Sequence, residues 1–176
     1  MDPHLRRALD HLDAATRNLS AEDWLRGPAG RWQCAEIVEH LGKAYGTTAY
    51  ILDKCVKEGA PKGRRPSLRQ RLSVAIVVGL GYLPSGVTAP AVTVPTGLSG
   101  VEALALARRS LQDLDGAAQR CADVFGPRAL VANHPILGGF TVGQWRRFHW
   151  IHTRHHVRQI RACRRCADLP VRATRL

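Results

Sequence analysis

The chain has 176 residues, 45% of them hydrophobic, which suits one folded domain with a core and excludes a largely disordered chain. Its 26 Lys and Arg against 14 Asp and Glu give a formal net charge of +12, which would attract nucleic acid, acidic lipid or an anionic small molecule without choosing among them. The longest apolar run, around Leu72–Leu83, is shorter than the about 20 residues that cross a bilayer, so we expect no membrane partner.

The first half of the chain carries helical signals. Asp2 followed by Pro3 is typical of an N-cap and a first helical position, and the stretch SAEDW predicts a second, short helix at 20–24. After a loop at 26–31, a long helix is expected from about 32 to 58. Its apolar stripe has helical spacing and consists of Ile37, Leu41, Ala44, Thr48 and Ile51.

The second half alternates capped helices with irregular connections. Three Ser or Thr residues followed three positions later by Glu or Gln indicate helix starts: Ser67 with Gln70, Ser99 with Glu102, and Thr141 with Gln144. The Gly/Pro-broken basic stretch at 59–66 predicts a loop, and 125–140 is interpreted as a connector. We interpret 87–95 as an extended crossover along the bundle, and we expect the last helix to reach about Cys166.

Four main helices with long connections, one of them a crossover, favour an all-α fold class and a four-helix bundle. We expect a single domain over 1–166 and a frayed tail over 167–176. The five cysteines have no framework spacing and are typical of free thiols in a reducing compartment. Together with the absence of an apolar signal core near the first residue, they favour a cytoplasmic protein. The apolar helix around Leu72–Leu83 is more hydrophobic than one bundle face requires, which favours a homodimer.

Four histidines lie within eight positions of the last predicted helix, at 149–156. His152 and His156 are four residues apart on its apolar face, so their rings lie one turn apart. Two imidazoles at this spacing can chelate one ion. His149 and His155 flank the same face. The stretch therefore has three open interpretations: a solvated polar face, a nucleic-acid contact or part of a metal site.

A third ligand is suggested by His40, which lies on the apolar side of the long helix predicted for 32–58. A metal that does chemistry usually has three protein ligands and an open position. An imidazole buried without a partner would be costly, and a metal shared with His152 and His156 would remove that cost. Glu36, one turn before His40, is a candidate catalytic residue that would orient a ligand or a bound water. His40 as a hydrogen-bonded core residue remains the alternative.

Three stretches in the same order resemble the DinB-like superfamily: WQCAEIVEHL at 32–41, LPSGVTAPAVTVP at 83–95, and HPILGGFTVGQWRRFHWIHTRHHVRQI at 134–160. The resemblance implies an up-down-down-up four-helix bundle with a long crossover. It also implies a metal triad of one histidine from the second helix and two, four apart, from the fourth. By motif these are His40, His152 and His156, the set that the helix faces suggest.

Characterised members of that superfamily include S-transferases that use small thiols, a thiol-dependent isomerase and self-resistance proteins that open reactive electrophiles. The resemblance implies a transferase or hydrolase in which zinc or nickel activates a thiol or water, with a low-molecular-weight thiol as a cosubstrate. Gln159 matches the family motif and is a candidate catalytic residue, whereas Gln33 and the VRQ at 157–159 depart from the usual pattern. Arg154 and Arg158 are candidates for binding a carboxylate of the thiol or substrate.

A basic nucleic-acid-binding or DNA-protecting protein of the same fold is the alternative function. The stretch KGRRPSLRQR at 62–71 and the arginines of the last helix would make the contacts. No base-reading motif is visible and only 6% of the residues are aromatic, so we do not favour it. No separate cofactor-binding motif, such as a P-loop, is present in the sequence.

Overall fold

The computed structural model describes residues 1–84 and 88–165, and this part of the chain is mostly helical, which confirms the all-α class. Its long helices are α1 (Pro3–Thr16), α3 (Cys34–Lys57), α5 (Gly100–Phe125) and α6 (Val142–Arg165). Shorter elements connect them: α2 (Ala21–Leu25), α4 (Leu68–Val74), the π-helical turn η1 (Ala75–Gly79), the 3-10 turn η2 (Ala91–Thr93), and the strands β1 (Ala132–His134) and β2 (Gly138–Phe140). The predicted frayed tail lies outside the described residues.

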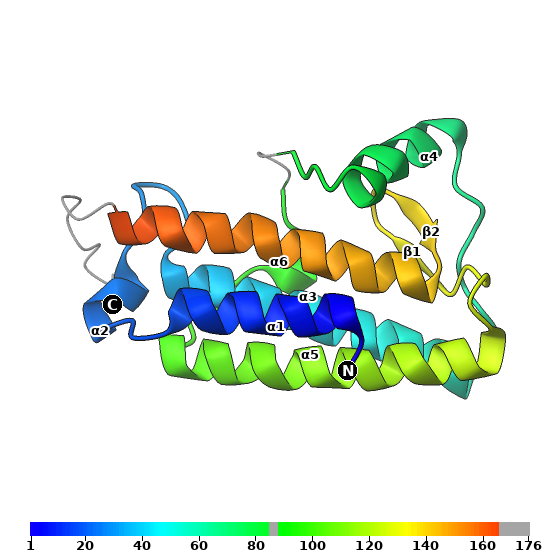
Figure 1. Ribbon diagram of the computed structural model, residues 1–176, viewed down its shortest axis with the longest axis horizontal. Coiled ribbons are helices and arrows are strands. Elements are labelled where there is room, and N and C mark those ends of the chain that lie inside the picture. The colour runs from blue at the N-terminus through cyan, green and yellow to red at the C-terminus, as the bar shows by residue number, and fades with distance from the viewer. Residues whose placement is uncertain (85–87, 166–176) are drawn as a thin grey trace.

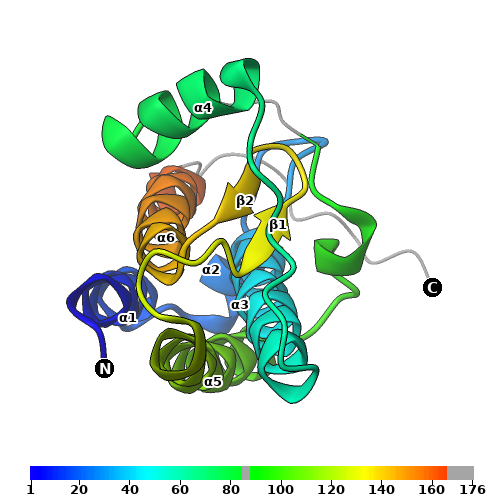
Figure 2. The same ribbon diagram turned by 90° about the vertical axis from the view of Figure 1, so that its right-hand side faces the viewer.

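The long helices lie side by side along the longest axis of the molecule (Figure 1). Seen end-on, α1, α3, α5 and α6 surround a common interior, whereas α4 and η1 lie outside them on the side of α6 (Figure 2). Helix α3 packs along α5, and α1 packs along α6. The α3–α5 contact is close at Gly42, where a Cβ atom would come within 3.0 Å of the Ala107 backbone nitrogen. None of the described helices is both long and apolar enough to cross a bilayer.

The helix starts follow the predicted caps. The Asp2 carboxylate accepts a hydrogen bond from the His4 backbone N–H at 2.8 Å. The capping boxes predicted from the sequence also form, with Ser67, Ser99 and Thr141 as the cap residues. Each box satisfies backbone donors that an uncapped first turn would leave without a partner. These local bonds explain why the helix starts could be predicted without knowledge of the fold.

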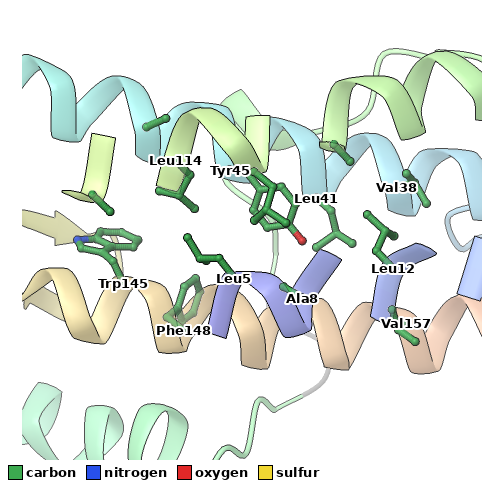
Figure 3. Packing of buried hydrophobic residues seen from close by; sticks show 14 of the residues in the cluster. Leu5, Ala8, Leu12, Val38, Leu41, Tyr45, Leu114, Trp145, Phe148 and Val157 are labelled. Carbon is green, nitrogen blue, oxygen red and sulfur yellow. The ribbon is translucent and has the colours of Figure 1, made fainter. Parts of the chain in front are cut away.

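Aliphatic and aromatic side chains from the four long helices fill the interior (Figure 3). On α1, Leu5, Ala8 and Leu12 are fully buried and lie at helical spacing. They pack against residues from α3, α5 and α6, among them Leu41 and Val157. Since burying one leucine contributes about 2 kcal/mol, the buried stripe of α1 is enough to attach this helix to the bundle.

The connector expected at 125–140 contains a β-hairpin that the sequence analysis did not predict. Strands β1 and β2 pair antiparallel, with Ala132 opposite Phe140. The imidazole Nδ1 of His134 accepts hydrogen bonds from the backbone N–H groups of Ile136 and Leu137, each at 3.2 Å, and so closes the turn. Each strand has three residues, too few for an alternating pattern to be recognised.

Candidate metal centre

The structure brings His40 of α3 together with His152 and His156 of α6. The Nε2 atom of His152 lies 3.2 Å from Nε2 of His40 and 3.0 Å from Nε2 of His156. One ring nitrogen from each of the three residues lies within 4.8 Å of the other two. The pair on α6 is adjacent because of its four-residue spacing, and the packing of α3 on the interior side brings in the third imidazole.

Hydrogen bonds on the far side of two rings determine their tautomers. Nδ1 of His40 lies 2.9 Å from the Thr93 carbonyl oxygen, and because a carbonyl can only accept, Nδ1 carries the proton. Nδ1 of His156 likewise donates to the Gln159 side-chain oxygen at 2.7 Å. In both residues Nε2 is therefore left with a lone pair directed into the cluster. This is the arrangement that orients metal-binding histidines.

The donor set fits a divalent metal better than it fits a network of hydrogen bonds. His152 can carry one proton on Nε2 and can donate it to only one of its two neighbours, which leaves a contact between two lone pairs. A cation between the three nitrogens would satisfy all of them. Two imidazole nitrogens that bind one tetrahedral zinc lie about 3.3 Å apart. The separations of His152 from His156 and from His40, 3.0 and 3.2 Å, are close to that value, and the His40 and His156 nitrogens lie within 4.8 Å of each other.

The surroundings keep these imidazoles neutral. All three side chains are at most 9% exposed. Burial lowers the pKa of His40 and lowers that of His156 to about 3. Burial, and then the nearby His156 and His40, keep the pKa of His152 well below its ordinary value. Because the neutral imidazole is the form that binds a metal, the three ligands are available at neutral pH without losing a proton.

Two aromatic rings, one from the connection before α3 and one from α6, hold two of the imidazoles in place. The Trp32 ring lies 4.9 Å from the His40 ring, measured between centroids. The Phe148 ring stacks on His152 at 5.5 Å, with an interplanar angle of 14°. These contacts limit rotation of the two rings and exclude water from their faces.

Sequence reasoning missed the contacts that place the crossover beside His40. Glu39 is fully buried, and its carboxylate accepts backbone hydrogen bonds from Thr96 at 2.7 Å and from Gly97 and Leu98 at 3.0 Å. It also pairs with the Lys43 ammonium at 2.8 Å. The segment that follows η2 is thereby attached to α3, next to the position where the Thr93 carbonyl meets His40. An acidic residue within the apolar stretch IVEHL was the only sequence signal for this contact.

The flanking histidines do not join the cluster. Nε2 of the buried His149 lies 3.0 Å from the Thr48 hydroxyl oxygen. Nε2 of the half-buried His155 lies 3.2 Å from the Gln159 side-chain nitrogen and accepts its hydrogen bond. Gln159 therefore bridges His155 and the ligand candidate His156. This contact accounts for the position of Gln159 in the motif.

Glu36 lies in the first turn of α3, one turn before His40. Its carboxylate accepts a hydrogen bond from the Gln33 backbone N–H at 2.7 Å and so caps the helix. Capping explains why an acidic residue is favourable here. The catalytic role suggested for Glu36 stays a prediction.

A cavity of about 330 Å³ lies on the outer side of α6, beside the start of the crossover. Arg154, His155, Arg158 and Gln159 line it from α6, and Tyr82 lines it from the connection. The guanidinium of Arg154 donates to the Gly81 carbonyl at 2.6 Å, whereas the side chain of Arg158 is exposed. Both arginines named from the sequence thus border one cavity, which Gln159 connects to His156.

Comparison with the curated proteins and with the solved structures gave no match. The sequence pattern of the DinB superfamily matches residues 4–160, which include the capped helices, the crossover and all three clustered histidines. On this match, which covers most of the chain, the protein belongs to the DinB superfamily.

Proposed function

We propose that the protein is a metal-dependent enzyme that activates a thiol or water for attack on a small electrophile, as an S-transferase or a hydrolase. The observation that carries the proposal is the convergence of three imidazole Nε2 atoms, two of them with lone pairs directed inward by Nδ1 hydrogen bonds. We further propose the up-down-down-up helix order for the bundle, since the long connection between α3 and α5 allows these two neighbours to run in the same direction.

In this proposal His40, His152 and His156 hold zinc or nickel. A bound divalent cation supplies a positive charge that lowers the pKa of a thiol or a water molecule into the neutral range. The chain's own contribution is a set of three neutral ligands, which leave the charge of the cation uncompensated. Trp32 and Phe148 exclude bulk water from the ligand rings, and this strengthens electrostatic interactions inside the site.

The arginine-lined cavity supports a substrate or thiol cosubstrate with an anionic group. Arg158 is exposed and can turn toward a ligand, and Arg154 is held at the rim by its bond to Gly81. A guanidinium binds a carboxylate through two parallel hydrogen bonds, which orients the ligand as well as attracting it. Gln159 lies between this cavity and His156. A substrate that binds Gln159 therefore also contacts the residue that accepts the His156 hydrogen bond.

Elemental analysis of the purified protein tests the metal site. We expect about one zinc or nickel ion per chain, and loss of the ion when His40, His152 or His156 is replaced by alanine. His11→Ala is the matched control, because His11 lies on α1 against Trp150 and outside the cluster. Circular dichroism confirms that each variant is folded. A wild-type protein that neither retains a metal nor takes up zinc or nickel would rule out the proposal.

A screen of small thiols with an electrophilic acceptor then tests the chemistry. The folded His152→Ala variant should lose turnover, and Arg158→Gln should raise KM for an anionic thiol while leaving its metal content unchanged. Turnover that persists in the metal-free variant would contradict the proposed role of the three histidines.

A further inference from the structure

The helix formed by α4 and η1 carries an exposed apolar stripe on the outside of the bundle. Leu68 and Leu72 of α4 are 80% and 65% exposed, Ile76 of η1 is 37% exposed, and Leu80, the C-cap of η1, continues the four-residue series at 81%. No residue of α4 is buried. The bundle holds this helix through its other face, where η1 contributes the buried Val77 and Val78 and contacts α6. Single exposed leucines need no explanation, but a continuous series along one helix indicates a contact surface.

Cations flank the stripe. At 100° per residue, Arg69 and Arg71 lie on opposite sides of the line that joins Leu68 and Leu72. Arg64 and Arg65 precede the helix and are exposed. None of these four arginines forms an ion pair within the described part of the chain.

The surroundings of the stripe add positive charge and no negative charge. From residue 59 to residue 101 the sequence contains no Asp or Glu. Arg147 of α6 donates to the Gly79 carbonyl at 2.6 Å, which attaches the end of η1 to α6 and brings a further cation to the same edge. The surface is thus both apolar and strongly basic.

The positive charge around the stripe distinguishes among the partners that could bind this surface. A second copy docked on the same face would bring like charges together, with no carboxylate in the segment to pair with them. A nucleic-acid backbone would satisfy the arginines but would leave the leucines in water. A bilayer with anionic headgroups satisfies both, since apolar side chains enter the acyl boundary and cations remain at the phosphates.

We propose that α4 and η1 form a docking surface for a bilayer that contains anionic phospholipid. The helix lies flat in the headgroup region, with Leu68, Leu72, Ile76 and Leu80 inserted, and this mode needs no membrane-spanning segment. The proposal departs from the expectation, drawn from the sequence, that the protein has no membrane partner. It does not depend on the metal centre, which lies inside the bundle.

Cosedimentation of the full chain with vesicles tests the proposal. We expect binding to phosphatidylcholine mixed with phosphatidylglycerol, weakening with added salt, and little binding to phosphatidylcholine alone. Replacing Leu68 and Leu72 by serine should weaken binding on the order of tenfold per residue. Replacing Arg69 and Arg71 by glutamine should weaken it about fivefold per residue.

The matched control is a pair of exposed valines on α5, Val101 and Val124, whose replacement by serine should leave vesicle binding unchanged. Thermal unfolding verifies that the leucine variant is folded. Absence of binding to the anionic vesicles, or equal binding by the folded leucine variant, would overturn the proposal. Sedimentation equilibrium supplies a second test: a wild-type dimer that becomes monomeric in the leucine variant would assign the stripe to self-association instead.

Discussion

Replacing Glu39 by glutamine should destabilise the protein strongly, although the two side chains have nearly the same shape. The carboxylate is fully buried and accepts three backbone hydrogen bonds from 96–98, besides one from the Thr96 hydroxyl at 2.7 Å. Glutamine retains one acceptor oxygen and directs its own N–H groups at donors, so about two part-buried donors of the crossover lose their partner. Because these donors are only part-buried, each unsatisfied one costs about 1–2 kcal/mol, and the expected loss is about 3 kcal/mol.

The pKa of Glu39 gives a second measure of the same interaction. Burial raises this pKa, but the Lys43 ammonium and the Leu98 and Thr96 donors together outweigh burial and lower it from 4.5 to about 2. At about 1.4 kcal/mol per pKa unit, this shift corresponds to about 3 kcal/mol of stabilisation of the folded state. Because the pKa is lower in the folded state, the stabilisation is complete above pH 4.5 and is lost as the pH falls toward 2.

Urea unfolding at neutral pH and at several values below pH 4.5 checks both expectations. The difference between wild type and Glu39→Gln should be largest at neutral pH and should shrink in acid. Glu102→Gln is the control, because that carboxylate also accepts a backbone hydrogen bond, from Ser99, but at an exposed helix start. The reasoning is refuted if Glu39→Gln costs no more than the control, or if its cost does not depend on pH. Zinc titration of the folded variant should also show weaker binding, since the crossover carries the acceptor of His40.

Three further outcomes are expected. Gln159→Leu should lower zinc affinity about 10- to 100-fold in calorimetric titration, because a ligand imidazole loses its acceptor, whereas Gln112→Leu on the exposed side of α5 should have no effect. Gly42→Ala should lower the free energy of unfolding by about 1–3 kcal/mol, because the added methyl group would clash with α5. Gly116→Ala is the control and should not lower it, because its methyl group would meet only a flexible arginine side chain. Equal losses of stability in the two variants would contradict this reasoning. Burial lowers the pKa of His134 to about 4, so wild-type stability should fall as the pH drops from 6.5 toward 4, and His134→Asn, measured by urea unfolding, should reduce that fall.

The parts of the fold that follow from short-range chemistry could be predicted from the sequence. Ser67, Ser99 and Thr141 each bond a backbone group three residues away, so their caps are visible in the sequence itself. The pairing of His152 with His156 follows from the helical repeat alone. Placing His40 in the same cluster required its position on an apolar helix face, together with the resemblance to a known family.

The contacts that sequence reasoning missed join distant parts of the chain. Glu39 contacts residues 57 to 59 positions further on, and His40 meets the Thr93 carbonyl at a separation of 53. Such contacts depend on how the crossover lies against α3, which no local pattern encodes. The hairpin was missed because its strands are short. The homodimer expected from the apolar helix around Leu72–Leu83 stays a prediction, because composition alone does not show which side of that helix the arginines share.

His40 and His156, the two metal-ligand candidates whose Nδ1 atoms donate a hydrogen bond, differ in how easily a mutation can remove the acceptor. The acceptor for His156 is the Gln159 side chain, so a single substitution removes it. The acceptor for His40 is a main-chain carbonyl, and every amino acid at position 93 would supply one. Substitutions at this position therefore leave the hydrogen-bond acceptor of His40 in place. Only a displacement of the main chain can remove it. Related proteins can accordingly differ at position 93 and still hold the helix-α3 ligand in the same tautomer.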